Sequence, residues 1–103
     1  MVYTENMKFE WDEEKAHRNL LKHGISFGQA ITAFDDPFAL VAADEKHSSA
    51  VEIREWLIGE SDDGVLVVVF TRRWRGQVYR IISARQANRR ERKRYEEFRG
   101  FSL

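Results

Sequence analysis

Cysteine is absent from the chain, and its absence excludes three classes of chemistry. Without it there are no disulfide bridges, no thiolate ligands for zinc and no cysteine nucleophile. Long apolar runs are absent as well, because no segment approaches the roughly 18 apolar residues of a membrane-spanning helix. Residues 1–8 lack the apolar centre of a signal peptide. We therefore expect a cytoplasmic protein that contacts no membrane.

Motifs for the common metal and cofactor chemistries are also missing. The sequence contains no glycine-rich phosphate loop, no paired-histidine metal motif and no nucleophile elbow. His17 and His23 fall on different sides of a predicted helix, and His47 falls in a predicted loop. We expect no preformed metal site and no cofactor.

The formal net charge of zero conceals an uneven distribution along the 103 residues. Residues 1–63 contain 6 Lys or Arg against 14 Asp or Glu, a charge of −8, whereas residues 64–103 contain 11 against 3, a charge of +8. The length suits one domain with a single core, after a loose lead at residues 1–7. The asymmetry indicates a basic surface, unless the two halves neutralise each other in the fold.

Capping residues predict two helices in the first half, after a short strand at residues 8–11. Asp12 caps a helix that ends at Gly24. Its apolar stripe contains Ala16, Leu20 and His23, and its polar stripe contains Lys15, Asn19 and Lys22. His23 thus lies at the edge of the core, either as a packed, hydrogen-bonded residue or as a catalyst.

A second helix runs from a capping box, Ser26 with Gln29, to about Phe34. Phe27, Ile31 and Phe34 face the core in this interpretation, and the Asp-Pro step at residues 36–37 stops the helix. Strands follow at residues 38–43, 52–59, 65–71 and 77–84. Their short connections predict an antiparallel meander, with the strand at 65–71 in the middle because it is apolar on both faces.

The last strand continues into a basic C-terminal helix. Alternation places Arg80 on one face of the strand, with Val78, Ile82 and Ala84, and Arg85 on the other. An arginine within an apolar strand either pairs with an acid or points into a cleft. Asn88 and Glu91 form a capping box for the helix, whose first turns are basic at five of the six residues 89–94. This run is either a solvated face or the site of a polyanion or acidic partner, and its unfavourable position for the helix dipole favours the second reading.

The side chains permit phosphodiester cleavage without a metal. Arginine forks match phosphate oxygens, and RNA carries its own nucleophile in the 2′-hydroxyl. A base, an acid and fixed cations then suffice. The candidate proton carriers are His23, His47, Lys15, Lys22, Glu52 and Tyr95, and the candidate cations are Arg72, Arg73, Arg75, Arg80 and Arg85.

Five ordered segments between residues 8 and 98 carry a resemblance to a known family. They are Trp11-Asp12 with Lys15, Lys22-His23-Gly24, Phe34-Asp35-Asp36-Pro37, Arg80 to Arg85, and Glu91-Arg92 with Tyr95-Glu96. In this order and spacing they resemble the BrnT toxins of bacterial type II toxin–antitoxin systems. The hairpin at residues 72–76 is longer and more basic than the family pattern.

The resemblance implies a RelE-like α+β fold in which two N-terminal helices pack on an antiparallel, mainly four-stranded sheet followed by a C-terminal helix. It also implies a toxin that arrests growth by cutting RNA. Its partner would be a BrnA-like antitoxin with a ribbon-helix-helix part, and operator DNA would be contacted only through that complex.

Two functions remain open at this stage. The first is a metal-independent endoribonuclease, in which Arg80 and Arg85 hold the scissile phosphate and His23 transfers a proton. Lys15, Lys22, Arg72 and Tyr95 would then position the RNA. The second is a non-catalytic module that binds a nucleic acid or an acidic protein through its basic strand and helix.

Overall fold

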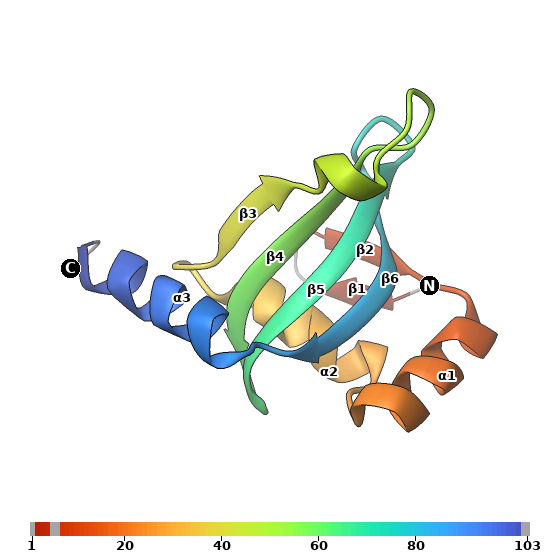
Figure 1. Ribbon diagram of the computed structural model, residues 1–103. Coiled ribbons are helices and arrows are strands. Elements are labelled where there is room, and N and C mark those ends of the chain that lie inside the picture. Colours follow the sequence, from red (N-terminus) through yellow and green to blue (C-terminus); the bar gives the residue numbers. More distant parts are fainter. Residues whose placement is uncertain (1, 5–6, 102–103) are drawn as a thin grey trace.

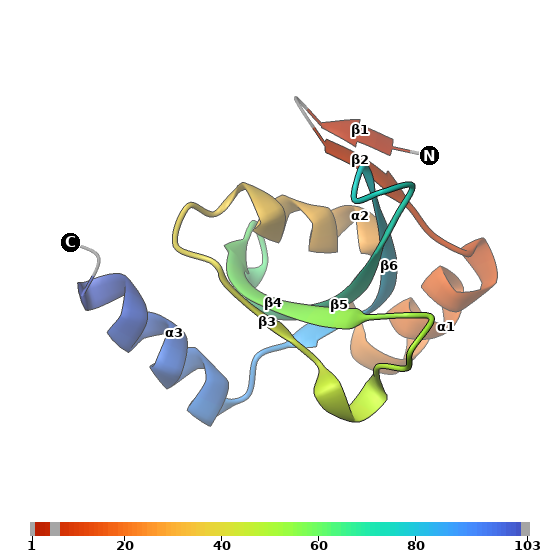
Figure 2. The same cartoon turned by 90° about the horizontal axis from the view of Figure 1, so that it is seen from above.

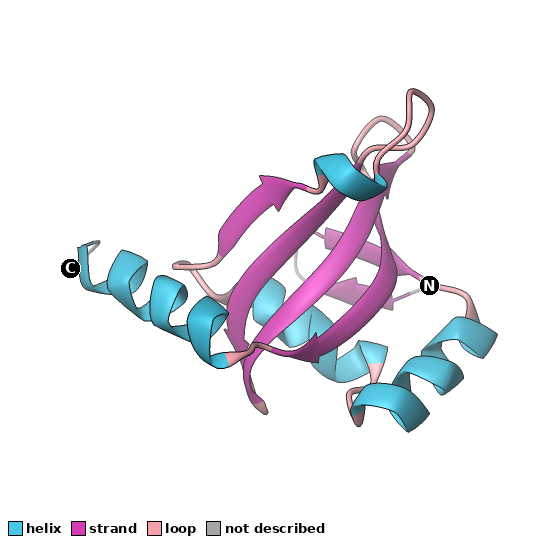
Figure 3. Cartoon of the chain, viewed as in Figure 1, coloured by secondary structure: helices cyan, strands magenta, loops and turns pink. Residues whose placement is uncertain are grey.

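One six-stranded mixed sheet organises the fold (Figures 1 and 3). The computed structural model describes the backbone of residues 2–4 and 7–101 and the side chains of residues 7–100. The strand order is β1-β2-β6-β5-β4-β3. The strands are β1 (Val2–Thr4), β2 (Met7–Glu10), β3 (Leu40–Ala43), β4 (Arg54–Ser61), β5 (Gly64–Arg73) and β6 (Val78–Gln86).

The antiparallel meander predicted for the last four strands is confirmed, since β3–β4, β4–β5 and β5–β6 all pair antiparallel. The prediction of a mainly four-stranded antiparallel sheet is incomplete. β2 joins β6 in parallel, with Phe9 opposite Tyr79, and β1 pairs with β2 at the edge. Three residues are too few to show a sequence period, so β1 was not predicted within the lead. Residues 1, 5 and 6 of that lead lie outside the described residues.

The helix α1 (Glu13–His23) begins and ends where its caps predict. The Asp12 side chain accepts hydrogen bonds from the backbone N–H groups of Glu14 and Lys15, which lower the pKa of its carboxyl. Gly24 ends the helix with a left-handed φ of 72°, a conformation that glycine adopts without a steric penalty.

The rotation of α1 differs from the prediction, because Asn19 of the polar stripe is buried while Leu20 of the apolar stripe is exposed. The Asn19 amide accepts from the Ala84 N–H at 3.1 Å and donates to the Ala84 oxygen at 2.8 Å. It also donates to the Ile25 oxygen at 2.9 Å. Burial of an amide is tolerated because its hydrogen bonds are made, and these polar bonds fix α1 to β6.

The segment after α1 covers one face of the sheet, which we call the core face. It consists of α2 (Phe27–Ile31) and the 3-10 helix η1 (Thr32–Asp35). The predicted α-helix thus ends earlier than expected, where the Thr32 hydroxyl donates to the Gln29 oxygen at 2.7 Å. As predicted, Phe34 packs on the sheet, with its ring edge-on to Phe70 at 5.2 Å and to Phe9 at 4.9 Å.

The helix α3 (Arg89–Phe101) packs at one end of the opposite face, which we call the open face (Figure 2). The predicted capping box is confirmed, because Glu91 N–H donates to Asn88 and Asn88 N–H donates to Glu91. Tyr95 is the buried anchor of the helix. Its ring joins a small cluster with Ile58 and Val67, while its hydroxyl donates to Asp36.

A β-bulge in β6 changes the faces predicted for its side chains. Ser83 lies opposite Val69 and Ile81 lies opposite Phe70, so Ile82 is an extra residue in the strand. Ile81 and Ala84 consequently both enter the core cluster. The prediction that Arg80 and Arg85 lie on opposite faces is therefore wrong: both project from the open face.

In the part of the chain that the structure describes, each helix is too short or too polar to span a lipid bilayer.

Candidate active site

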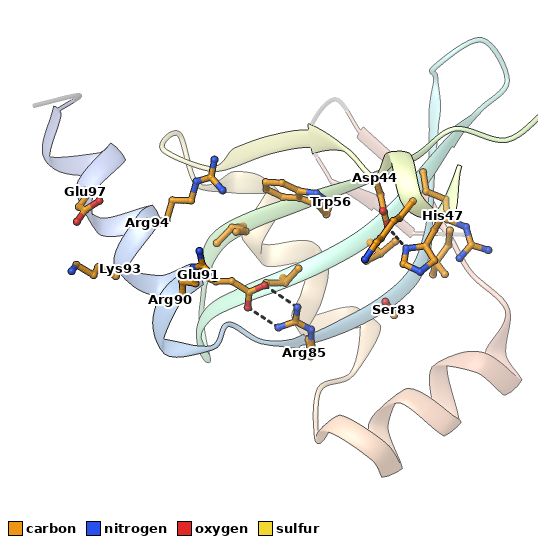
Figure 4. A pocket seen from close by; sticks show the side chains of 16 residues that line it. Asp44, His47, Trp56, Ser83, Arg85, Arg90, Glu91, Lys93, Arg94 and Glu97 are labelled. Carbon is orange, nitrogen blue, oxygen red and sulfur yellow. Dashed lines mark hydrogen bonds and ion pairs between the residues drawn. The ribbon is translucent and has the colours of Figure 1, made fainter. Parts of the chain in front are cut away.

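A groove of about 1150 Å³ crosses the open face between α3 and the 3-10 helix η2 (Glu45–His47) (Figure 4). Its floor is apolar and consists of Ile58, Val67, Val69 and Ile82. Its other lining residues are polar, charged or aromatic: Asp44, Lys46, His47, Arg54, Trp56, Ser83, Arg85, Arg90, Glu91, Lys93, Arg94 and Glu97. The volume exceeds the roughly 300–1,000 Å³ of small-molecule sites, which favours a segment of a larger ligand.

Arg85 projects from β6 into this groove and meets Glu91 of α3 as a two-pronged fork. Arg85 Nη1 lies 2.7 Å from one Glu91 carboxylate oxygen, and Nη2 lies 2.9 Å from the other. The hydrogen bonds from Arg85, together with the one from Asn88 N–H, lower the pKa of Glu91 despite its partial burial. The Arg85 side chain stays 41% exposed, so it can contact a ligand while it is paired.

His47 and Asp44 form a second polar pair at the η2 end of the groove (Figure 4). His47 Nδ1 lies 2.9 Å from Asp44 Oδ2, and the His47 side chain is 64% exposed against 17% for Asp44. When Nδ1–H donates to the carboxylate, Nε2 is left free to accept a proton. The pair is therefore built like a general base with an orienting acid.

Arg54 supplies a cation close to this pair and is tied to the neighbouring loop. Its Nε donates to Glu52 at 3.3 Å, and Arg73 Nη2 approaches the other oxygen of the same carboxylate at 3.9 Å. The Arg54 backbone also holds the histidine segment in place, because its oxygen accepts from Asp44 N–H and its N–H donates to Ser48. The short η2 turn is thereby fixed against the start of β4.

The α3 wall of the groove carries more positive than negative side chains. Arg90, Lys93 and Arg94 line the groove, and among the described residues none of their side chains has an ion pair or hydrogen bond. Trp56 offers a half-buried indole on the floor side of the same cavity. Cations beside an aromatic surface are the combination that binds single-stranded RNA.

The structure brings only one of the three predicted catalytic residues into the groove. Arg85 lines it, whereas Arg80 lies outside it on the same face, with Nη1 3.7 Å from Glu10 Oε2. Of the two roles considered for Arg80, pairing with an acid or pointing into a cleft, the geometry matches the ion pair. His23 is half-buried in the last turn of α1 and does not line the groove.

The predicted RNA contacts are likewise divided between surfaces. Lys15 and Lys22 are exposed on α1. Arg72 projects from the core face, where it makes a fork with Glu55 at 2.7 and 3.2 Å and lies over the Tyr79 ring. Tyr95 is 1% exposed, and burial together with its hydrogen bond to Asp36 raises its pKa to about 12. It thus holds α3 in place and offers no free surface to RNA.

The sequence analysis identified only part of the site in the loop that carries His47. His47 and Glu52 were candidates for proton transfer, but Asp44, Arg54 and Trp56 were not identified. The usable signal was Asp44 three residues before His47, because this spacing within one helical turn lets a carboxylate reach an imidazole. Within the described residues no group of three or more His, Asp or Glu side chains could hold a metal ion.

Comparison with protein families gives the chain an identity. Residues 11–91 match the family described as "Ribonuclease toxin, BrnT, of type II toxin-antitoxin system". The matched range begins just before α1 and ends at Glu91, so it includes both groove pairs, His47 with Asp44 and Arg85 with Glu91. No curated protein matches the chain. The match covers most of the sequence, and the chain belongs to the BrnT family of type II toxin–antitoxin ribonuclease toxins.

Proposed function

We propose that this chain is a metal-independent endoribonuclease that cuts RNA in the groove of the open face and thereby arrests growth. The observation that carries the proposal is the presence of an Asp-oriented imidazole and two guanidinium groups, those of Arg54 and Arg85, in one groove. Such a groove supplies a proton carrier and fixed cations, and RNA supplies the nucleophile.

The proposed reaction is an internal transfer. The 2′-oxygen of the RNA attacks the adjacent phosphorus as His47 Nε2 accepts the 2′-hydroxyl proton. The bond from phosphorus to the 5′-oxygen breaks, that oxygen takes a proton from the solvent, and His47 afterwards returns its proton to the solvent. The products are a 2′,3′-cyclic phosphate and a 5′-hydroxyl end. Asp44 holds the imidazole and stabilises its protonated form.

Arg85 and Arg54 have the electrostatic role in this proposal. Negative charge builds up on the phosphoryl oxygens in the transition state, and fixed guanidinium groups stabilise it without reorganising. Glu91 keeps the Arg85 fork in one orientation. Trp56 would stack on a base beside the scissile phosphate.

His23 and His47 are competing candidates for the proton carrier, and they can be separated by substitution. His47→Gln should lower the cleavage rate about 10²- to 10⁴-fold, the usual contribution of a general base. His23→Gln should leave the rate within about twofold, because His23 lies on α1 outside the groove. The opposite result would restore His23 as the proton carrier and refute the role of His47.

The decisive assay is incubation of the purified chain with RNA in excess EDTA. Discrete products with cyclic phosphate ends support the proposal. Binding that leaves the RNA intact would favour the second candidate function, a non-catalytic binding module, for which the unpaired cations of α3 are the supporting observation. Cleavage that stops on chelation and returns with a divalent cation would refute metal independence.

The partner that the family implies is an antitoxin, and we propose a BrnA-like protein with a ribbon-helix-helix part. An acidic, amphipathic segment of it would cover α3 and mask Arg85, since the groove cations must be hidden to make the toxin harmless. Growth on expression, with and without the neighbouring gene product, tests this directly. Arrest that the neighbour does not relieve would contradict the pairing.

A further inference from the structure

The turn between β5 and β6 lies at the end of the sheet near η2 (Figure 1). It carries an exposed tryptophan, Trp74. Trp74 is 71% exposed, although an indole ring contributes most when it is buried. Its surroundings are a shallow hollow formed with Val51, Glu52 and the neighbouring strand end. Burial in the folded chain therefore does not explain a tryptophan at this position.

The backbone of the turn is costly as well. Trp74 and Arg75 have φ values of 55° and 58°, and Gly76 follows at 82°. Only the glycine adopts this left-handed region without a penalty, and a bulky residue there is a rare exception. Strained backbone of this kind is concentrated at functional sites, and here it accompanies an indole that is left exposed.

Positive charge surrounds the indole. Arg73 and Arg75 flank it, and both are exposed. Arg73 shares the carboxylate of Glu52 with Arg54, which lines the groove. Within the described residues Arg75 has no ion pair or hydrogen bond. The turn thus extends the cationic lining of the groove beyond the η2 end, and an aromatic ring stands within it.

We propose that Trp74 is a stacking platform for one RNA base outside the groove, and that Arg73 and Arg75 hold the phosphates on either side of that base. Every base has a face that can stack on an indole, so this contact extends the bound RNA without reading its sequence. The inference rests on the proposed function only in taking RNA as the ligand. Its consequence is a second point of attachment that lies apart from the reacting phosphate.

The test is a binding measurement with RNA that cannot be cut. An oligonucleotide of about 12 residues with 2′-O-methyl groups lacks the nucleophile and lies within the usual site sizes of single-strand binders. Trp74→Asn removes the ring and suits the left-handed turn better than tryptophan, so it should fold normally. It should weaken binding roughly 5- to 150-fold, while Trp74→Phe should bind nearly as well as the wild type. Leu21→Ala is the matched control, because Leu21 is similarly exposed (74% against 71% for Trp74) but lies on α1.

A series of probes, each with one abasic position, locates the stacked base. In the wild type one position should carry a penalty that disappears in Trp74→Asn, because the two changes remove the same contact. Equal binding by Trp74→Asn and the wild type, or an identical abasic profile in both, would overturn the inference. Binding that depends on Trp74 in a chain that cuts no RNA would keep this platform and refute the ribonuclease proposal. RNA cleavage combined with RNA binding that does not depend on Trp74 would keep the ribonuclease proposal and refute the platform.

Discussion

The two faces of the sheet differ in how their side chains are used. On the core face, aromatic rings fill the space under α2 and η1, and Phe9, Phe34, Phe70 and Tyr79 contact one another edge-on or tilted. On the open face, the buried apolar residues around Tyr95 form only a small cluster, and much of the remaining surface is a groove lined by charged side chains.

This difference shows how the alternation of side chains along a strand lets one face of a sheet stabilise the fold while the other face forms the groove. Residues that point to the core face can be chosen for packing, while their neighbours along the strand can be chosen for the groove. The bulge at Ile82 is the exception that strengthens the separation, because it lets Ile81 and Ala84 join the core and still directs Arg85 to the groove.

The largest effect should come from opening the core face. Phe34→Ala should lower the free energy of unfolding by roughly 3–5 kcal/mol, because a ring that packs against three others leaves a cavity. Urea denaturation measures this loss. Val41→Ala, on exposed β3 surface, is the control and should cost less than about 1 kcal/mol. If the two variants lost similar free energies of unfolding, Phe34 would not contribute more to stability than an exposed residue, and the packing argument would fail.

Substitution of one arginine on each face tests whether catalysis belongs to the open face alone. The two residues are Arg85 on the open face and Arg72 on the core face. Arg85→Ala should lower the cleavage rate about 10²- to 10³-fold, the usual effect of removing one transition-state donor, and it should shift the thermal midpoint little. Arg85→Lys should restore little, since an ammonium cannot form the fork. Arg72→Ala should change the rate less than about threefold, since Arg72 pairs with Glu55 on the core face. If Arg85→Ala and Arg72→Ala lowered the cleavage rate equally, catalysis could not be assigned to the open face alone.

A smaller effect should follow from loosening the contact that anchors α3. Burial opposes ionisation of Asp36, but hydrogen bonds from Glu60 N–H, the Tyr95 hydroxyl and Phe38 N–H outweigh it and lower the pKa of this carboxyl. Tyr95→Phe removes one of these donors and should cost about 1.5–3 kcal/mol at neutral pH, the range for hydrogen bonds to charged groups. A double-mutant cycle with Asp36→Asn isolates the pair.

The same tyrosine predicts a loss of stability in alkali. Its pKa in the folded state is about 12, raised by burial and by Asp36 from an ordinary value near 10. The stabilisation is thus fully present below pH 10 and is lost as the pH rises through 12. Asp36, with a lowered pKa, gives stability above about pH 3.8 that is lost as the pH falls further. Urea midpoints at pH 7 and pH 11 should diverge less in Tyr95→Phe than in the wild type.

The smallest effect concerns the rate at which the antitoxin associates with the open face, the surface that we propose it covers. Arg90→Glu with Arg94→Glu should slow association with the neighbouring gene product about 3- to 30-fold at low salt, and high salt should reduce the difference. The dissociation rate should change less. Stopped-flow association at two salt concentrations provides the comparison. An on-rate indifferent to both salt and charge reversal would move the antitoxin to another surface.

Local signals in the sequence predicted the local features well. Asp12, the Ser26–Gln29 box and the Asn88–Glu91 box all cap the helices they were assigned to, because a cap depends on residues within one turn. The meander was predictable for the same reason, since short links leave few alternatives. The packing of Phe34 followed from the apolar period of its segment.

The site was less predictable because it depends on contacts between distant segments. The extra residue in β6 has no signature of its own, so alternation placed Arg85 on the wrong face. Asn19 looked solvent-exposed because its partner, Ala84, lies 65 residues away. Arg80 and His23 belong to ordered motifs, yet only the folded chain separates them from the groove.

Asn19 has a further consequence, for how the protein behaves among other copies of itself. β2 pairs with β6 only from Val78 to Arg80, so the backbone of β6 beyond that point has no strand on that side. There the Asn19 amide makes both hydrogen bonds of the Ala84 backbone, accepting from its N–H and donating to its C=O, as a residue of a neighbouring strand would. An uncovered stretch of edge is where a second chain can add its own strand and begin to aggregate. Replacing this one side chain would therefore endanger solubility as well as stability, at a distance from the groove.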